Sequence, residues 1–186
     1  MMTNNLTNLL SSPAPIILDG GFATELEALG ADLNSSLWSA RLLAESPEII
    51  RSAHSNYFRA GARVATTASY QATIQGFTDQ GYSQQEAERL LRLSVQLADE
   101  ARQHCESSDE LVVAASIGPY GAYLADGSEY TGNYGVSDVE LRDFHESRIR
   151  LLESSNADFF ACETIPSYQE AKVLSEILTN TKKSAW

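Results

Sequence analysis

Two carboxylates follow short apolar runs, the places where buried strands would deliver side chains to a ligand. Asp19 comes directly after residues 16–18 (IIL), and Glu163 comes directly after residues 158–162 (DFFAC). A partly desolvated carboxylate needs a cationic partner. Glu163 could therefore anchor the ammonium group of a small molecule.

Both carboxylates also have a structural interpretation. Asp19 with Gly20 and Gly21 is typical of a tight turn in which Asp caps the next helix, and spacing alone favours that interpretation. The alternative is that the glycines let backbone N–H groups approach an anionic ligand group, such as a carboxylate. For Glu163, a helix cap or salt bridge and a ligand anchor are equally compatible with the sequence.

Other chemistry finds little support. The sequence contains no GxGxxG, GxxxxGK[ST] or GxSxG motif, which argues against dinucleotide, phosphate-loop and nucleophile-elbow sites. Cys162 neighbours Glu163 on a predicted strand, so it should face the opposite side and pack against helices. The sparse cysteines indicate a reducing compartment, and the histidines are predicted to lie at the surface or to pack on helices. These residues are Cys105, Cys162, His54, His104 and His145.

The elements that position these residues alternate between strand and helix. Strands are predicted over residues 16–18, 63–67, 111–116 and 158–162. Helices are predicted to begin at Ser46-Pro47 and at three capping boxes, Ser83/Glu86, Ser137/Glu140 and Ser167/Glu170. Strands separated by helices become parallel neighbours, with ligands bound at their carboxyl ends. The pattern is α/β and fits either an open doubly wound sheet or part of a (β/α)8 barrel.

The net charge and the terminal segment indicate which classes of partner and which cellular location to expect. The net charge is −12, which disfavours nucleic acid and anionic membranes. Residues 1–14 are predicted to be a loose leader with no secretory signal, and no apolar run would span a bilayer, so the expected location is the cytoplasm. The tyrosine-rich segment 117–135 is long enough to be a lid or pocket wall.

Four segments together carry a specific resemblance. ILDGGFATELEALG, TTASYQAT, SIGPYGAYLADGSEY and FFACETIPSYQEA follow one another between about Pro15 and Trp186. In this order and spacing they resemble the homocysteine S-methyltransferases, most closely the branch that uses S-methylmethionine. The resemblance implies a (β/α)8 TIM barrel that transfers a methyl group from S-methylmethionine, or S-adenosylmethionine, to the homocysteine thiol to give methionine.

The resemblance also implies roles for particular residues. Asp19, Gly20, Gly21 and Phe22 match the family motif that lines the amino-acid end of homocysteine. Glu163 matches a family carboxylate that meets the substrate ammonium.

The family holds a catalytic Zn2+ with three cysteines that lie late in the barrel. Neither cysteine of this chain matches those positions, so no metal ligand is assigned. We therefore expect residues 15–186 to be the N-terminal half of a homocysteine-binding barrel, roughly its first four β-α units. Alone, this half should be inactive.

Two alternatives remain open at this stage. A non-catalytic half barrel could bind an amino acid weakly or self-associate through exposed sheet edges. An open-sheet enzyme could instead use Asp19 and Glu163 for acid–base work on another substrate.

Overall fold

A parallel sheet with helices forms the centre of the molecule. The computed structural model describes residues 5–11, 13–34 and 38–186. In this part, strands β1 (Val64–Thr66), β2 (Val112–Ile117) and β3 (Phe159–Cys162) pair in the order β1-β2-β3. All pairing is parallel, with Val64 opposite Val112 and Ala114 opposite Phe159. The predicted α/β class is confirmed.

The prediction of a strand over residues 16–18 is wrong. Only Leu18 forms a bridge, parallel to Val64, supported by Arg63 N–Ile17 O and Asp19 N–Val64 O hydrogen bonds of 2.8 and 3.0 Å. Ile17 and Leu18 are 55% and 50% exposed, so the run is not enclosed on both faces as a buried strand would be. At the opposite edge, Ala185 forms a similar parallel bridge to Phe160.

The helices begin largely where the capping residues predicted. The longer ones are α4 (Pro47–Arg59), α6 (Gln84–Gln103), α8 (Asp138–Glu153) and α9 (Tyr168–Leu178). The shorter ones are α1 (Asn5–Leu10), α2 (Phe22–Ala28), α3 (Trp38–Glu45), α5 (Ile74–Asp79), α7 (Tyr120–Leu124) and the 3-10 turn η1 (Ser128–Tyr130). Ser83, Ser137 and Ser167 each accept a hydrogen bond from the backbone N–H three residues later.

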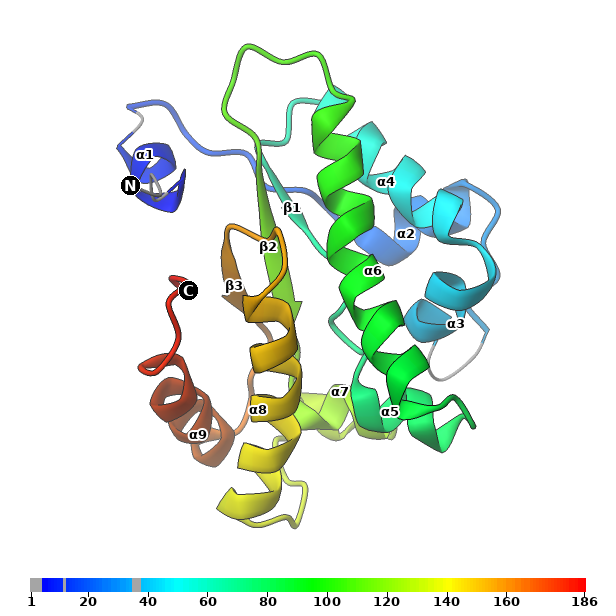
Figure 1. Cartoon of the computed structure of the whole chain (residues 1–186), viewed down its shortest axis with the longest axis vertical. Helices are drawn as coiled ribbons and strands as arrows, with labels where there is room; N and C mark the ends of the chain where they lie inside the picture. Colours follow the sequence, from blue (N-terminus) through cyan, green and yellow to red (C-terminus); the bar gives the residue numbers. More distant parts are fainter. Residues whose placement is uncertain (1–4, 12, 35–37) are drawn as a thin grey trace.

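The two faces of the sheet are covered differently. Side chains alternate along each strand, so Ala65, Val113, Ala115 and Phe160 join the large core with the helices. The opposite face carries Val64, Val112, Ala114, Phe159 and Ala161, which form a smaller cluster with Leu9 of α1. Figure 1 shows α4, α6 and α8 on one side, with α1 and the C-terminal end on the other.

The N-terminal segment is more ordered than predicted. Residues 5–10, placed in a loose leader by their polar composition, form α1, and Leu9 is 1% exposed. Leu9 packs there against the apolar strand residues of the smaller cluster, and its burial stabilises the segment on the sheet. Residues 1–4 and 12 of the predicted leader lie outside the described residues.

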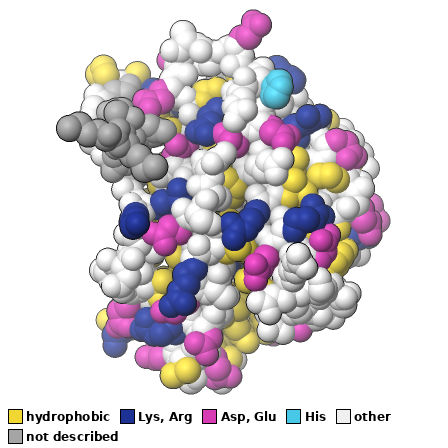
Figure 2. Space-filling model, viewed as in Figure 1, with side chains coloured by type: hydrophobic (Ala, Val, Ile, Leu, Met, Phe, Trp, Pro, Cys, Tyr) yellow, Lys and Arg dark blue, Asp and Glu magenta, His cyan; other side chains and the backbone are white. Residues whose placement is uncertain are grey.

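The surface carries charged side chains of both signs. On the face shown in Figure 2, acidic and basic side chains are interspersed. Several pair along α8, where Glu146 contacts both Arg142 and Arg150. No helix in the described ranges is long and apolar enough to cross a bilayer.

Candidate functional site

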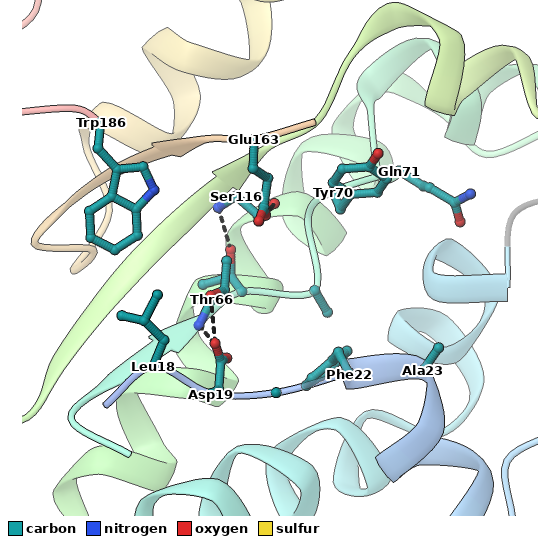
Figure 3. Close-up of a pocket in the computed structure, with 13 residues that line it drawn as sticks. Leu18, Asp19, Phe22, Ala23, Thr66, Tyr70, Gln71, Ser116, Glu163 and Trp186 are labelled. Carbon is teal, nitrogen blue, oxygen red and sulfur yellow. Dashed lines mark hydrogen bonds between the residues drawn. The ribbon is translucent and has the colours of Figure 1, made fainter. Parts of the chain in front are cut away.

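A cavity of about 380 Å³ lies at the carboxyl ends of the strands (Figure 3). Three of its walls are the segment after Leu18, the segment after β1, and the ends of β2 and β3. Its lining comprises Leu18, Asp19, Gly20, Phe22, Ala23, Thr66, Thr67, Ala68, Tyr70, Gln71, Ser116, Glu163 and Trp186. The structure thus brings together Asp19, Gly20, Phe22 and Glu163, the residues predicted to share a site.

Gly21 is the predicted site residue that does not line the cavity. It precedes α2 as its N-cap, and its carbonyl oxygen accepts a hydrogen bond of 2.9 Å from the Tyr57 hydroxyl. Gly20 also lies against this tyrosine, since a Cβ at position 20 would come within 3.1 Å of the Tyr57 ring. The absence of a side chain at Gly20 therefore lets the chain pass close to α4.

Asp19 is bound to the neighbouring strand. Its two carboxylate oxygens accept hydrogen bonds from the backbone N–H and the hydroxyl of Thr66, at 2.6 and 2.8 Å. Burial raises the pKa of Asp19 to about 6, with a smaller contribution from the charge of Glu163 and opposition from the Thr66 bonds. The helix-cap interpretation of Asp19 is wrong, because the cap of α2 is Gly21 and has no side-chain bond.

Glu163 extends β3 by one residue and projects into the same cavity (Figure 3). Its backbone N–H continues the ladder to Ile117 O at 3.3 Å, and its Oε1 accepts a hydrogen bond from the Ser116 hydroxyl. Burial raises the pKa of Glu163, and the Ser116 bond opposes that rise. Among the described residues, no Lys, Arg or His forms an ion pair with Asp19 or Glu163. The cavity therefore suits a cationic ligand group.

Hydroxyl groups hold the ends of β1 and β2 together beneath the cavity. Thr67 Oγ1 accepts from the backbone N–H of Ser116 at 3.0 Å and contacts Ser69 Oγ at 2.6 Å. The Ser69 hydroxyl donates to Ser116 O at 2.8 Å. The sequence showed hydroxyls at the strand ends but gave no sign of which partners they bind, because those bonds cross between strands.

Two further polar groups lie beside the cavity, although the sequence did not predict them as site residues. Gln71 lines the cavity, and its Oε1 is buried without a hydrogen-bond partner among the described residues. Behind Phe22, the ring of His54 lies 4.8 Å from the phenyl ring, with both ring nitrogens buried and unpartnered in the described part. Burial lowers the pKa of His54 to about 3, so the ring is neutral at physiological pH.

The tyrosine-rich segment 117–135 was expected to wall a pocket, and none of its residues lines this cavity. It packs instead on α8, where Tyr120 and Tyr123 contact the ring of Phe144. The Tyr134 hydroxyl donates to Glu170 Oε2 at 2.9 Å. Tyr120 and Tyr123 thus pack against an aromatic side chain of α8, whereas Tyr134 binds a buried carboxylate.

The described residues do not form a zinc site. No three His, Cys, Asp or Glu side chains in the described ranges are grouped closely enough to hold a metal ion. Cys162 faces a groove along α9 with Ile165 and Leu174, on the side away from Glu163, as its position on the strand predicted. Burial raises the pKa of its thiol to about 11, so it is not a ready thiolate.

Comparison with known proteins gives one family throughout. The family model for homocysteine S-methyltransferase matches residues 16–186. The chain is 50% identical to homocysteine S-methyltransferase YbgG of Bacillus subtilis, covering 98% of this chain and 61% of that protein. It is also 50% identical to a selenocysteine Se-methyltransferase of Brassica oleracea, covering 87% of this chain and 51% of that protein.

A solved structure agrees with the sequence relatives. The metallated form of the homocysteine methyltransferase MmuM from Escherichia coli superposes with a TM-score of 0.92 at 46% identity, covering 98% of this chain and 65% of that one. The chain therefore spans between about half and two thirds of the length of these relatives. With a family model and close relatives over nearly its whole length, it belongs to the homocysteine S-methyltransferase family.

Proposed function

We propose that this chain binds the amino-acid end of homocysteine, with Glu163 as the ammonium anchor and Asp19, Gly20 and Phe22 forming the adjoining wall. The observation that carries the proposal is the pair of cavity carboxylates for which no described side chain supplies a cation. A substrate ammonium would offset the unfavourable burial of both charges. The two relatives named for homocysteine and selenocysteine act on α-amino acids, which supports recognition through this shared end.

The proposed architecture is the first half of a (β/α)8 barrel. Following the pairings across the sheet gives Leu18, β1, β2, β3 and Ala185 as successive neighbours in chain order. A doubly wound sheet changes direction at a switch point, whereas barrel strands follow one another in sequence. Placement of the large helices on one face also supports a barrel, and it weighs against the open-sheet acid–base enzyme.

In the proposed reaction, S-methylmethionine or S-adenosylmethionine donates a methyl group to the homocysteine sulfur. The residues described here would orient the acceptor and exclude water from its amino-acid end. Because they do not form a zinc site, we assign no thiol-activating step to them and expect negligible methionine formation by the 186-residue chain alone. A cytoplasmic location stays a prediction.

Binding of reduced L-homocysteine, measured by isothermal titration calorimetry on the 186-residue chain, tests the proposal. Glu163→Gln should weaken binding by at least tenfold, because the amide carries no charge for the ammonium. Glu27→Gln, which changes an exposed glutamate of α2, should bind as the unaltered chain does. A second ligand, 4-mercaptobutanoate, lacks the ammonium and should bind equally weakly to all three proteins.

Two results would contradict the proposal. One is absence of saturable homocysteine binding by the unaltered chain at millimolar ligand. The other is equal affinity for homocysteine and 4-mercaptobutanoate, which would show that the ammonium is not recognised.

Self-association is a second candidate property, favoured by the sheet edges. Ile17, Leu18 and Trp186 are 55%, 50% and 46% exposed beside the terminal bridges, where backbone groups have a strand partner on one side. Light scattering across a dilution series should show a dimer or larger species. A monodisperse monomer at tens of micromolar would exclude this property.

A further inference from the structure

The residue after Glu163 has an unusual backbone. Thr164 has φ +58°, in the left-handed region that β-branched residues strongly disfavour. A residue persists in such a conformation only where its surroundings enforce it, and such residues gather at functional sites. Thr164 directly follows Glu163, which lines the cavity, so its conformation could affect the site.

The left-handed turn changes which way the neighbouring side chains face. In a continuing strand, residues 163 and 165 would share one face, because side chains alternate with period two. Here Glu163 lines the strand-end cavity, whereas Ile165 lines the separate groove along α9 together with Cys162. Thr164 therefore breaks the alternation. It leaves the Glu163 carboxylate in the cavity while the chain returns Ile165 to the helical side.

A tyrosine from another wall of the cavity holds this turn. A side-chain hydrogen bond joins Thr164 to Tyr70, which lines the cavity after β1. Tyr70 in turn lies against Gly118, where an added Cβ would come within 2.5 Å of Tyr70 O and 2.7 Å of its ring. Tyr70 is thus packed closely against the end of β2 while its side chain binds Thr164.

We propose that Thr164 is a positioning residue for the proposed homocysteine site: its left-handed backbone, fastened by Tyr70, aims the Glu163 carboxylate at the ligand ammonium. The inference rests on the proposed function for its ligand. Its geometric content, the placement of Glu163, is a property of the free chain and can be measured without any ligand.

The decisive variant is Thr164→Gly. Glycine adopts the left-handed conformation without a steric penalty, so the variant should fold and melt at the same temperature or higher. It loses the hydroxyl that binds Tyr70 and gains backbone freedom, so we expect homocysteine affinity to fall at least fivefold. A merely structural residue would not combine unchanged or greater stability with weaker binding.

A matched control is available in the same fold. Ala125 also has a left-handed backbone, φ +53°, but it is exposed at the end of α7 and does not line the cavity. Ala125→Gly should share the gain in thermal stability while leaving homocysteine affinity unchanged. Tyr70→Phe, which removes only the hydroxyl, should weaken binding as Thr164→Gly does. The double variant should be no weaker than the worse single one.

The ligand-free readout is the NMR titration of the Glu163 carboxyl carbon. In the unaltered chain the pKa of Glu163 should lie above that of an exposed glutamate, because its carboxyl group is buried. In Thr164→Gly it should move toward the exposed value as the side chain gains access to water, and in Ala125→Gly it should not move. An unchanged Glu163 titration in Thr164→Gly would overturn the positioning role, whatever homocysteine binding shows.

If Thr164→Gly shifts the titration but the unaltered chain does not bind homocysteine, the positioning of Glu163 stands and the proposed substrate fails. If binding is present and equal in the two proteins, the positioning role fails and the proposed substrate stands.

Discussion

Two glutamates seven positions apart, Glu163 and Glu170, show two ways in which this protein treats a buried carboxylate. Glu163 lines the cavity and accepts a hydrogen bond from the Ser116 hydroxyl. Glu170 is fully buried at the start of α9 and accepts hydrogen bonds from Tyr120 N, Tyr134 Oη and His145 Nε2 at 2.5, 2.9 and 2.8 Å. One carboxylate is enclosed by protein partners and the other faces an open cavity.

The partners around Glu170 form a charge-compensated cluster. Arg148 is 1% exposed, contacts His145 Nδ1 at 2.8 Å and donates to the carbonyl of Gly118. Donation by the guanidinium to Nδ1 places the ring proton on Nε2, where it is donated to Glu170. The comparison suggests a rule: a carboxylate satisfied by protein partners supports the fold, whereas the carboxylate without an ion-pair partner among the described residues is the one that we propose for ligand binding.

The strongest way to break this comparison is Glu170→Ala, which leaves Arg148 buried without its compensating charge. We expect the free energy of unfolding to fall by about 3–5 kcal/mol. Urea denaturation followed by far-UV circular dichroism measures the change. Glu176→Ala, at a 49% exposed position on the same helix, should cost within about 1 kcal/mol. Equal losses of unfolding free energy at the two positions would show that the buried cluster stabilises the fold no more than an exposed ion pair does.

Gly118 links the two regions, because its carbonyl binds Arg148 and its Cα lies against Tyr70. Gly118→Ala places a Cβ within 2.5 Å of Tyr70 O, so the backbone must shift. The expected loss is about 1–3 kcal/mol in unfolding free energy, accompanied by weaker homocysteine binding. Denaturation and calorimetry on the same sample check both effects. An unfolding free energy and a homocysteine affinity equal to those of the unaltered chain would mean that the backbone relieves the contact between residue 118 and Tyr70 at little cost.

Acid should destabilise the fold through its buried histidines. The pKa of His145 is lowered to about 4 and that of His54 to about 3, in both cases chiefly by burial. The unfolded chain binds these protons first, so stability falls as pH drops from about 6.5 toward these values, by up to about 1.4 kcal/mol per pH unit for each histidine.

Asp19 acts in the opposite direction, because its raised pKa favours the folded state at low pH and that contribution is lost as pH rises through about 6. Unfolding free energies between pH 7 and pH 4 measure the balance. His54→Phe should flatten the profile, whereas exposed His104→Phe should leave it unchanged. Parallel profiles for the two variants would contradict the assignment to His54.

The smallest expected effect is a change in stability on replacing the cavity glutamate, Glu163. Glu163→Gln should raise stability slightly at pH 7, because burial of the Glu163 charge is unfavourable in the free chain. The raised pKa of Glu163 means that its own contribution is favourable below the ordinary glutamate pKa and is lost at higher pH. The advantage of glutamine should therefore vanish near pH 4. Thermal melts at pH 4 and 7 test this, and a destabilised variant at pH 7 would refute it.

Sequence patterns could not predict most of the difference between the surroundings of Glu163 and Glu170. The order of elements was predictable, because apolar strands and serine caps are local signals, and Glu163 at a strand end was a recognisable candidate. Ser167/Glu170 had the form of a capping box, yet only its serine half forms in the structure. The Glu170 side chain turns inward to a histidine 25 positions earlier in the chain. Partners so distant in sequence, like the Thr66 bonds of Asp19, depend on tertiary contacts.

Two errors have the same physical origin. Residues 16–18 are apolar enough for a strand, but a strand also needs neighbours, and here only Leu18 finds one. Residues 5–10 are polar enough for a loose leader, but Leu9 finds an uncovered apolar face. In each case the packing environment, which the local sequence does not contain, decided the outcome.

The central claim is that Glu163 is the carboxylate that receives the ligand ammonium, whereas Glu170 is not. The most direct measurement is the NMR titration of both carboxyl carbons in the 186-residue chain, with and without saturating L-homocysteine. We predict that homocysteine lowers the pKa of Glu163, because a bound ammonium stabilises its charged form, and leaves the Glu170 signal unchanged. A Glu163 titration that does not respond to the ligand would contradict the account.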